Sequence, residues 1–197
     1  MADLLIKPLT GAGNTVTIQD QAGGAVLTTA DSGATIADGV TLPAVIVNSP
    51  MFRANYLVSN GTISSANDAY TAFANNREIE LDSSGNASTS MFNESNKRYT
   101  PDTAGYYYFL VQCALDDVSD GSAMGVSLWK NGSNVRDVEM RIGYSSGTKA
   151  TSCSSIEYMN GSSDYVEGRV KHYFAGQGNR SIIGGNYAIF AGYKLGI

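Results

Sequence analysis

Few residues of this chain carry the side chains that acid–base or nucleophilic catalysis requires. His172 is the only histidine, and the two cysteines, Cys113 and Cys153, lie far from it and from each other in the sequence. A catalytic nucleophile works beside a base that activates it, and zinc is held by clustered histidine and cysteine ligands. The sequence therefore predicts no catalytic residue, no zinc site and no cofactor, and it predicts a structural role for His172 in a strand.

Three aspartates come closest to a metal-ligand cluster. Asp116, Asp117 and Asp120 share one acidic stretch and offer the oxygen ligands that calcium prefers. Calcium loops commonly end in a glutamate that binds the ion with both oxygens, and no glutamate follows here at the expected spacing. We interpret the stretch as a solvated acidic loop and keep the three aspartates as weak calcium candidates.

Two glutamates and three loop residues are the remaining candidates. Glu78 and Glu80 stand two positions apart in an alternating stretch, which predicts a shared strand face. Such a pair could act on a glycan, but nothing marks a cleft, so we favour a polar strand face. Tyr144, Asn160 and Tyr165 combine aromatic faces with an amide, which suits a sugar ligand, but we favour ordinary loop composition as their explanation and keep sugar binding as the alternative.

The strand predicted over residues 106–115 is the element around which the chain is organised. A turn signal at 101–105 precedes it, and both of its faces are apolar. An antiparallel strand normally turns one face to water, so a strand with two apolar faces needs a second covering layer. We expect that layer to be another chain.

The composition predicts an all-β protein. The chain has 22 glycines, 12 tyrosines and only 16% charged residues, and turn dipeptides such as Asn131-Gly132 separate alternating segments. About eight to ten strands at this spacing favour an antiparallel sandwich or jelly roll over residues 51–197.

Residues 1–50 differ from the rest. Segments 15–20 and 25–29 form a predicted β-hairpin, and a further pair of short strands is expected at 34–36 and 40–42. No aromatic residue precedes Phe52, so this segment has little material for a core of its own. We interpret it as an attachment or shaft segment.

The charge, the apolar runs and the cysteine content limit which partners and which cellular compartment we expect. The net charge of −5 and the absence of a Lys/Arg cluster argue against nucleic-acid or anionic-membrane partners. No apolar run is long enough to cross a bilayer, and the first residues lack the pattern of a signal peptide, so we expect synthesis in a cytoplasm. Two semi-buried thiols are the favoured interpretation of the cysteines, with a Cys113–Cys153 cross-strand bridge as the alternative.

Several spaced motifs resemble one known family. They are FRA at 52–54, RYTP at 98–101, GYYYF at 105–109, VSLWKNG at 126–132, DYV at 164–166 and FAGYKL at 190–195. In this order they resemble the globular head of complement subunit q, which shares a ten-stranded jelly roll with the tumour necrosis factors. The resemblance covers about residues 52–197. It implies a homotrimer in which strands 106–115 and 187–195 face the threefold axis, and some family members bind calcium near the top of the trimer.

The resemblance and the two-faced strand together predict a subunit interface. We assign to it Tyr106, Tyr108, Leu110, Ile189 and Phe190. The chain lacks the collagen-like stalk of the animal members, and its N-terminal segment instead resembles the N-termini of virion proteins of tailed phages, particularly those of marine hosts. We therefore expect a non-enzymatic virion protein, assembled in the host cytoplasm: a trimeric fibre, knob or capsid-decoration protein that residues 1–50 attach to the capsid or tail. The alternative is a receptor- or glycan-binding tip module, an adhesin.

Overall fold

The computed structural model describes residues 17–19, 22, 25–30, 33–36, 50–56, 61–63, 70–143, 147–173 and 178–195. The chain divides into two compact units, Met1–Val45 and Ile46–Ile197. Within these described ranges, no helix is long and apolar enough to span a membrane.

The first unit contains a small antiparallel sheet. Its strands β1 (Thr17–Gln19), β2 (Ala25–Ala30) and β3 (Gly33–Ile36) pair in this order. The β1–β2 pair confirms the predicted hairpin. β3 pairs with β2, whereas its expected partner at 40–42 lies outside the described residues.

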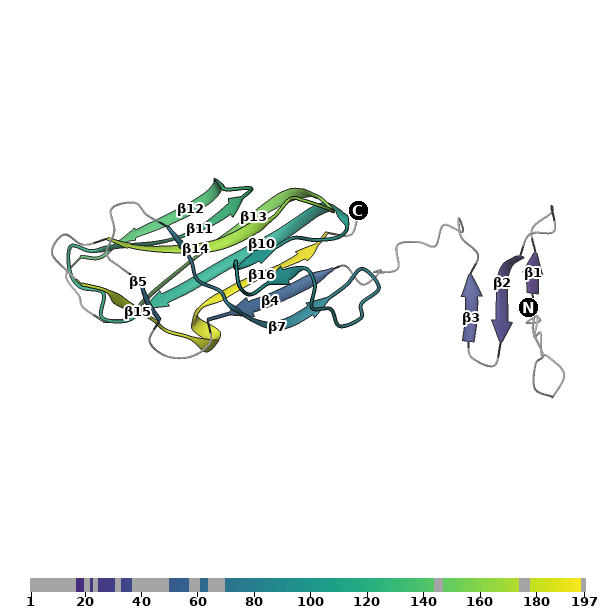
Figure 1. Cartoon of the computed structure of the whole chain (residues 1–197), viewed down its shortest axis with the longest axis horizontal. Helices are drawn as coiled ribbons and strands as arrows, with labels where there is room; N and C mark the ends of the chain where they lie inside the picture. Colours follow the sequence, from purple (N-terminus) through teal and green to yellow (C-terminus); the bar gives the residue numbers. More distant parts are fainter. Residues whose placement is uncertain are drawn as a thin grey trace, which may run out of the picture. The chain divides into compact units, whose positions relative to one another are not determined.

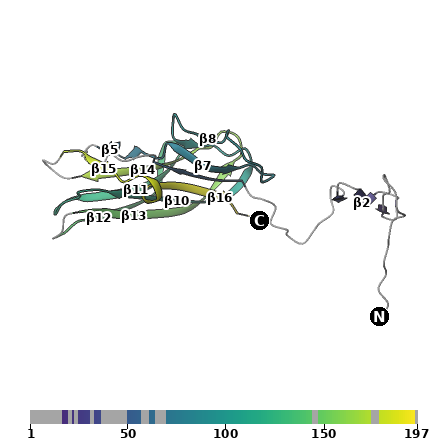
Figure 2. The same cartoon turned by 90° about the horizontal axis from the view of Figure 1, so that it is seen from below.

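The second unit is a sandwich of two antiparallel sheets, as predicted. The seven-stranded sheet contains β4 (Met51–Asn55), β5 (Gly61–Ile63), β7 (Asn76–Leu81), β10 (Ala104–Leu115), β13 (Lys149–Asn160), β15 (Arg180–Ile182) and β16 (Ile189–Lys194). The six-stranded sheet contains β6 (Thr71–Ala72), β8 (Phe92–Asn93), β9 (Arg98–Tyr99), β11 (Ala123–Lys130), β12 (Ser133–Arg141) and β14 (Val166–Tyr173). A 3-10 helix, Gly185–Tyr187, precedes β16. The long strands run along the length of the sandwich (Figure 1; Figure 2).

β10 lies in the middle of the seven-stranded sheet. β13 pairs with it along its whole length and β16 pairs with its other edge, so that β13, β10, β16, β4 and β7 follow one another across the sheet (Figure 1). Burial alternates as the sequence predicts. Tyr107, Phe109 and Val111 are fully buried in the core, whereas Tyr106 is 47% exposed.

Aromatic side chains from both sheets fill the core. The ring of Phe52 stacks on that of Tyr99 at a centroid distance of 3.9 Å and meets the edge of Phe190 at 4.8 Å. Each such fully buried side chain stabilises the fold by about 1.5–3 kcal/mol. Phe190 therefore belongs to the core, and its assignment to a subunit interface is wrong. Alternation along β16 turns Phe190 inward and leaves Ile189 on the outer face.

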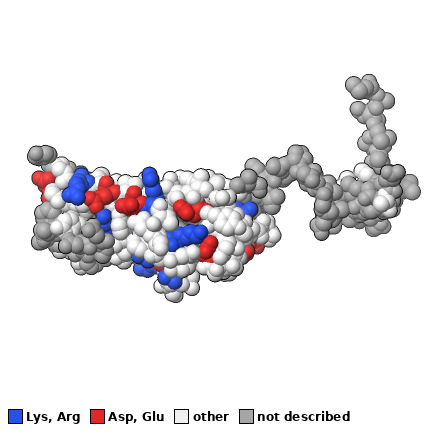
Figure 3. Space-filling model, turned by 90° about the horizontal axis from the view of Figure 1, so that it is seen from above, with Lys and Arg blue, Asp and Glu red and all other residues white. Residues whose placement is uncertain are grey.

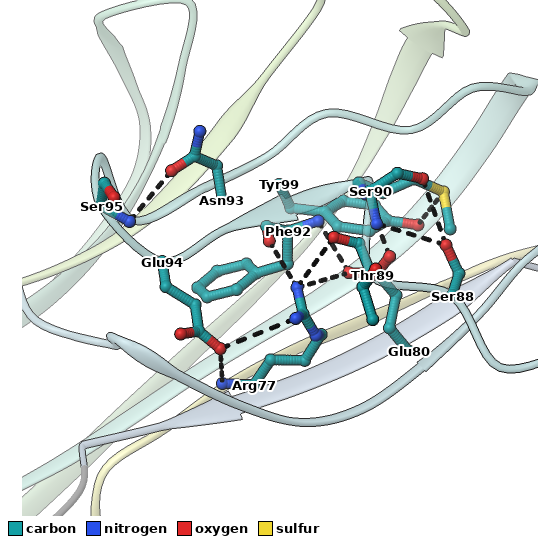
Figure 4. A network of polar contacts seen from close by, with 11 residues as sticks. Arg77, Glu80, Ser88, Thr89, Ser90, Phe92, Asn93, Glu94, Ser95 and Tyr99 are labelled. Atoms are coloured by element: carbon teal, nitrogen blue, oxygen red, sulfur yellow. Dashed lines mark hydrogen bonds and ion pairs between the residues drawn. The ribbon is translucent and has the colours of Figure 1, made fainter.

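A buried carboxylate fastens the loop before β8 to β7. The side chain of Glu80 accepts hydrogen bonds from the backbone N–H groups of Met91 (3.0 Å) and Phe92 (2.7 Å). Arg77 lies 3.8 Å from this carboxylate and donates to the carbonyl oxygens of Thr89 and Phe92 (Figure 4). These contacts give Glu80 a structural role.

Glu78 does not share the environment of Glu80. The β4–β7 register shifts between Arg53 and Ala54, which makes Glu78 the extra residue of a β-bulge. Glu78 pairs with Arg53 (2.6 Å), while Glu80 faces the loop before β8. The expectation that the two carboxylates share a strand face is therefore wrong, because the bulge interrupts the alternation.

Gly192 tests the close packing of the core. A Cβ atom at this position would lie 2.5 Å from Cδ1 and 2.8 Å from Cε1 of Phe109. We expect Gly192→Ala to lower the free energy of unfolding by about 1–3 kcal/mol, the usual cost of overpacking. Gly178→Ala, where a Cβ meets nothing within 4 Å, is the control. Equal denaturant midpoints for the two variants would contradict this packing.

Glu80 gives a second stability test. Glu80→Gln removes the charge and one of the two oxygens that accept backbone N–H groups, so we expect a loss of about 1–3 kcal/mol in urea unfolding. Glu94→Gln is the matched control: Glu94 is 46% exposed, lies 3.9 Å from the guanidinium of Arg77 and accepts the backbone N–H of Arg77 through one oxygen, which glutamine retains. That change should stay within about 0.5 kcal/mol. A Glu80→Gln protein as stable as the control would show that the buried network contributes nothing.

Candidate subunit interface

The outer face of the seven-stranded sheet carries a group of apolar side chains, which we call the apolar face; Arg53 of β4 separates one member, Ile79, from the others. The register of five neighbouring strands places them together. The group comprises Tyr106, Tyr108 and Leu110 on β10, Ile156 and Tyr158 on β13, Ile189, Ala191 and Tyr193 on β16, Met51 on β4 and Ile79 on β7. Exposed apolar patches of this kind typically mark an interaction site on a soluble protein.

Tyrosine pairs give the apolar face a fixed shape. Tyr106 lies opposite Tyr158 in the β10–β13 register, and their ring centroids are 5.4 Å apart. Tyr108 lies opposite Tyr193 in the β10–β16 register, at 5.5 Å. Within each pair the two rings restrict each other's side-chain rotamers, which reduces the side-chain entropy that these four residues would lose on association.

Most of the apolar residues gather at one end of the face, whereas Ile189 lies toward the other end, opposite Gln112. The end that holds most of them is the end where the chain enters the sandwich, since the N–H of Lys194 donates to the carbonyl of Pro50. Toward the other end of β10 and β13 the same face becomes polar, with Gln112, Ser152 and Ser154. The face is thus divided along its length into an apolar and a polar part.

Four of the five predicted interface residues lie on this face. Tyr106, Tyr108, Leu110 and Ile189 point outward, in contrast to Phe190. The sequence analysis missed Ile156, Tyr158 and Tyr193, which are 57%, 49% and 47% exposed. Ile156 and Tyr158 are two positions apart in a serine-rich stretch, and this alternation could have revealed them.

The described side chains of the predicted ligand loops already make contacts within the chain. Tyr144 lies outside the described residues. The side-chain oxygen of Asn160 accepts hydrogen bonds from the N–H groups of residues 162, 163 and 164, which closes its own turn. The guanidinium of Arg98 lies 4.0 Å above the ring of Tyr165. The fold therefore already uses the amide of Asn160 and the ring of Tyr165.

The outer face of the six-stranded sheet carries charges that are paired with one another. Glu167 accepts hydrogen bonds from Nε of Arg98 (2.9 Å) and of Arg169 (3.0 Å). The guanidinium of Arg169 lies 4.1 Å above the ring of Trp129. Lys171 pairs with a carboxylate of β12 at 2.7 Å. Positive and negative side chains are likewise interspersed on the face seen in Figure 3.

The candidate calcium ligands and the two cysteines form neither a metal site nor a disulfide among the described residues. Across the described residues, no three His, Cys, Asp or Glu side chains are grouped as metal ligands. Asp116 accepts a hydrogen bond from the hydroxyl of Thr148 at 3.0 Å. Cys113 and Cys153 are both free and buried, so the bridge alternative is wrong. Burial raises the pKa of Cys153 to about 11, which keeps its thiol protonated and unreactive.

Comparisons with known proteins support the architecture. No family model and no curated protein matches the sequence. Among solved structures, murine APRIL aligns with a TM-score of 0.52 and 9% identity, over 75% of this chain and 100% of its own. This is a TNF-like jelly roll. The globular domain of the zebrafish complement 1qA protein aligns with a TM-score of 0.48 and 16% identity, over 75% of this chain and 98% of its own. At these identities the TNF-like jelly roll is established as a fold alone.

Tyr106 tests whether the apolar face is buried between subunits. We expect Tyr106→Asp to shift the purified protein from oligomer to monomer, because a charge would lose its water at the centre of an apolar contact. The folded monomer should survive, since this side chain is half exposed. Tyr173→Asp changes an exposed tyrosine of β14, on the other sheet, and should leave the oligomer intact. Light scattering measures the mass, and an intact Tyr106→Asp oligomer would show that the face is not the contact.

Proposed function

We propose that this chain is a non-enzymatic structural protein of a phage particle, which forms a homotrimer through the apolar face and is fixed to the capsid or tail by residues 1–50. The observation that carries the proposal is the exposed apolar face of a TNF-like jelly roll. Domains with this fold typically form homotrimers. In a threefold ring each subunit meets two neighbours, and in the proposed trimer the apolar face of every chain lies toward the shared axis and packs against both of them.

Burial of the apolar face gives enough free energy to hold copies of the chain together. A half-exposed large apolar side chain gains about half of the 1.5–3 kcal/mol that full burial provides. Five such side chains, Ile79, Tyr106, Ile156, Tyr158 and Tyr193, are 47–57% exposed. Together they gain about 4–8 kcal/mol for each subunit, and the summed gain of two or more subunits exceeds the lower part of the cost of association. The choice of three copies rests on the fold.

The N-terminal unit supports the attachment role. Its three short strands, β1 to β3, lack any aromatic residue, and small sheets of this kind gain stability by docking on a larger assembly. The resemblance of residues 15–29 to the N-termini of phage virion proteins motivates the choice of a particle as that assembly. Location in the virion is part of the proposal.

A receptor- or glycan-binding tip is the second candidate. A fibre tip presents its ligand site at the end away from its attachment. Asn160 pairs with Ala104 and the N–H of Leu195 donates to the carbonyl of Tyr106, which places Asn160 at the same end as the entry of the chain at Pro50. The described loop candidates therefore do not favour an adhesin, and binding on a glycan array would be needed to support one.

The mass of the purified full-length chain tests the proposal. We expect light scattering to give three times the chain mass of 20.8 kDa. Deleting residues 1–50 should leave the trimer intact and abolish its incorporation into particles when it is supplied to an infected host. A stable full-length monomer would overturn the trimer, and incorporation of the shortened chain would overturn the attachment role.

A further inference from the structure

His172 is a fully buried titratable side chain that the subunit interface does not use. Alternation along β14 turns it toward the core together with Val166 and Val170, and its exposed fraction is 0%. It lies opposite the equally buried Met124 of β11. Among the residues that the structure describes, neither ring nitrogen has a hydrogen-bond partner. Buried polar atoms in proteins are almost always hydrogen bonded, so this imidazole is an exception that demands an explanation.

The surroundings of the ring oppose a positive charge. Burial lowers the pKa of His172 from its ordinary value, and the positive charge of Arg180 on β15 lowers it further. β11 contributes the uncharged Met124, and the residues of β5 have no titratable side chains. At this end of β10 the titratable core residue is Cys113, whose thiol stays neutral because burial raises its pKa. The described elements around the ring therefore favour its neutral form.

The ring lies close to the point where the chain passes from one sheet to the other. β14 ends one residue after His172, and the next strand, β15, belongs to the seven-stranded sheet and has only three residues. Two backbone hydrogen bonds of 2.9 Å hold β15 and its flank to the end of β10. They run from the N–H of Asp116 to Ser181 and from the N–H of Ile183 to Ala114. The pairing of β15 with β10 is limited to Ile182 opposite Leu115, whereas its other edge pairs with β5 at three positions.

We propose that His172 is an acid-sensitive latch: uptake of a proton by its ring at mildly acidic pH releases β15 from β10 and opens this end of the sandwich, while the aromatic core stays folded. No bond other than the N–H of the ring is formed, and the proton comes from solvent. The device belongs to the single chain and is independent of the proposed trimer.

The sign of the pH dependence follows from the two states. In the opened form the ring meets water and has an ordinary pKa of about 6.5, whereas the closed form has a lower pKa. The opened form therefore binds the proton more tightly. The closed form keeps its full stability above about pH 6.5 and loses it as the pH falls from there toward the lower pKa. One proton changes the opening equilibrium by at most about tenfold per pH unit.

Amide hydrogen exchange measures the opening directly. The probes are the N–H groups of Asp116 and Ile183, which make the two bonds between β10 and the β15 segment. Their protection, corrected for the intrinsic exchange rate, should fall by up to about tenfold per pH unit below about pH 6.5. Protection of Phe109, at the centre of β10, should not change. His172 is the only histidine, so its ring signals in a carbon–proton NMR spectrum report the protonation without ambiguity.

Two variants separate the latch from general acid effects. His172→Phe has no ring to protonate and should keep constant protection at both probes down to about pH 5.5, above the range where carboxylates titrate. Arg180→Gln retains the histidine but removes the positive charge beside it, so the loss of protection should be smaller than in the natural chain. A folded-state ring that titrates at or above about pH 6.5, or an unchanged loss in either variant, would overturn the proposal. If His172→Phe does not fold, the ring titration and Arg180→Gln decide.

Discussion

The presence of apolar side chains on both faces of β10 is the constraint on which the rest of the structure depends. The inner face, with Tyr107, Phe109 and Val111, is buried against the opposing sheet. The outer face is only partly covered, because Tyr106 keeps 47% of its surface exposed even with Tyr158 packed beside it. A strand of this kind builds the core of the sandwich with one side, and in the proposed trimer it packs against a second chain with the other. Core packing and the proposed association would therefore both depend on the same twelve residues, Ala104–Leu115.

Close approach of the sheets depends on small residues beside the aromatic ones. Gly192 lies against the ring of Phe109, and a Cβ atom at Gly168 would come within 3.0 Å of Val111 and Phe190. The rings fill the space that the missing side chains leave, and interiors packed at this density transmit any added volume to their neighbours. The glycines of β14 and β16 thus set the separation of the layers. The high glycine content of the sequence indicates many turns, but Gly168 and Gly192 lie within strands, where they allow close packing.

The sequence was most informative where the alternation of side chains along a strand was sufficient to predict the structure. It predicted both faces of β10, the N-terminal hairpin and the jelly roll, because strand alternation and turn residues are local signals. It failed where a position depends on a neighbour distant in sequence. Phe190 was assigned to the wrong face because β16 is apolar on both sides, and Glu80 was interpreted as a surface residue because its partners, the N–H groups of Met91 and Phe92, come from another segment. Burial of a charge by backbone donors leaves no mark in the pattern of side chains.

The two sheets differ in how well their outer faces suit the proposed contact. On the six-stranded sheet, Glu167 is already buried and bonded to Arg98 and Arg169, and covering that network would remove the remaining water from the two guanidinium groups with little electrostatic gain in return. On the seven-stranded sheet, the tyrosine pairs would gain free energy when water leaves them. In the proposed trimer, the paired charges therefore contribute to specificity, because they make their own face a poor place to bind.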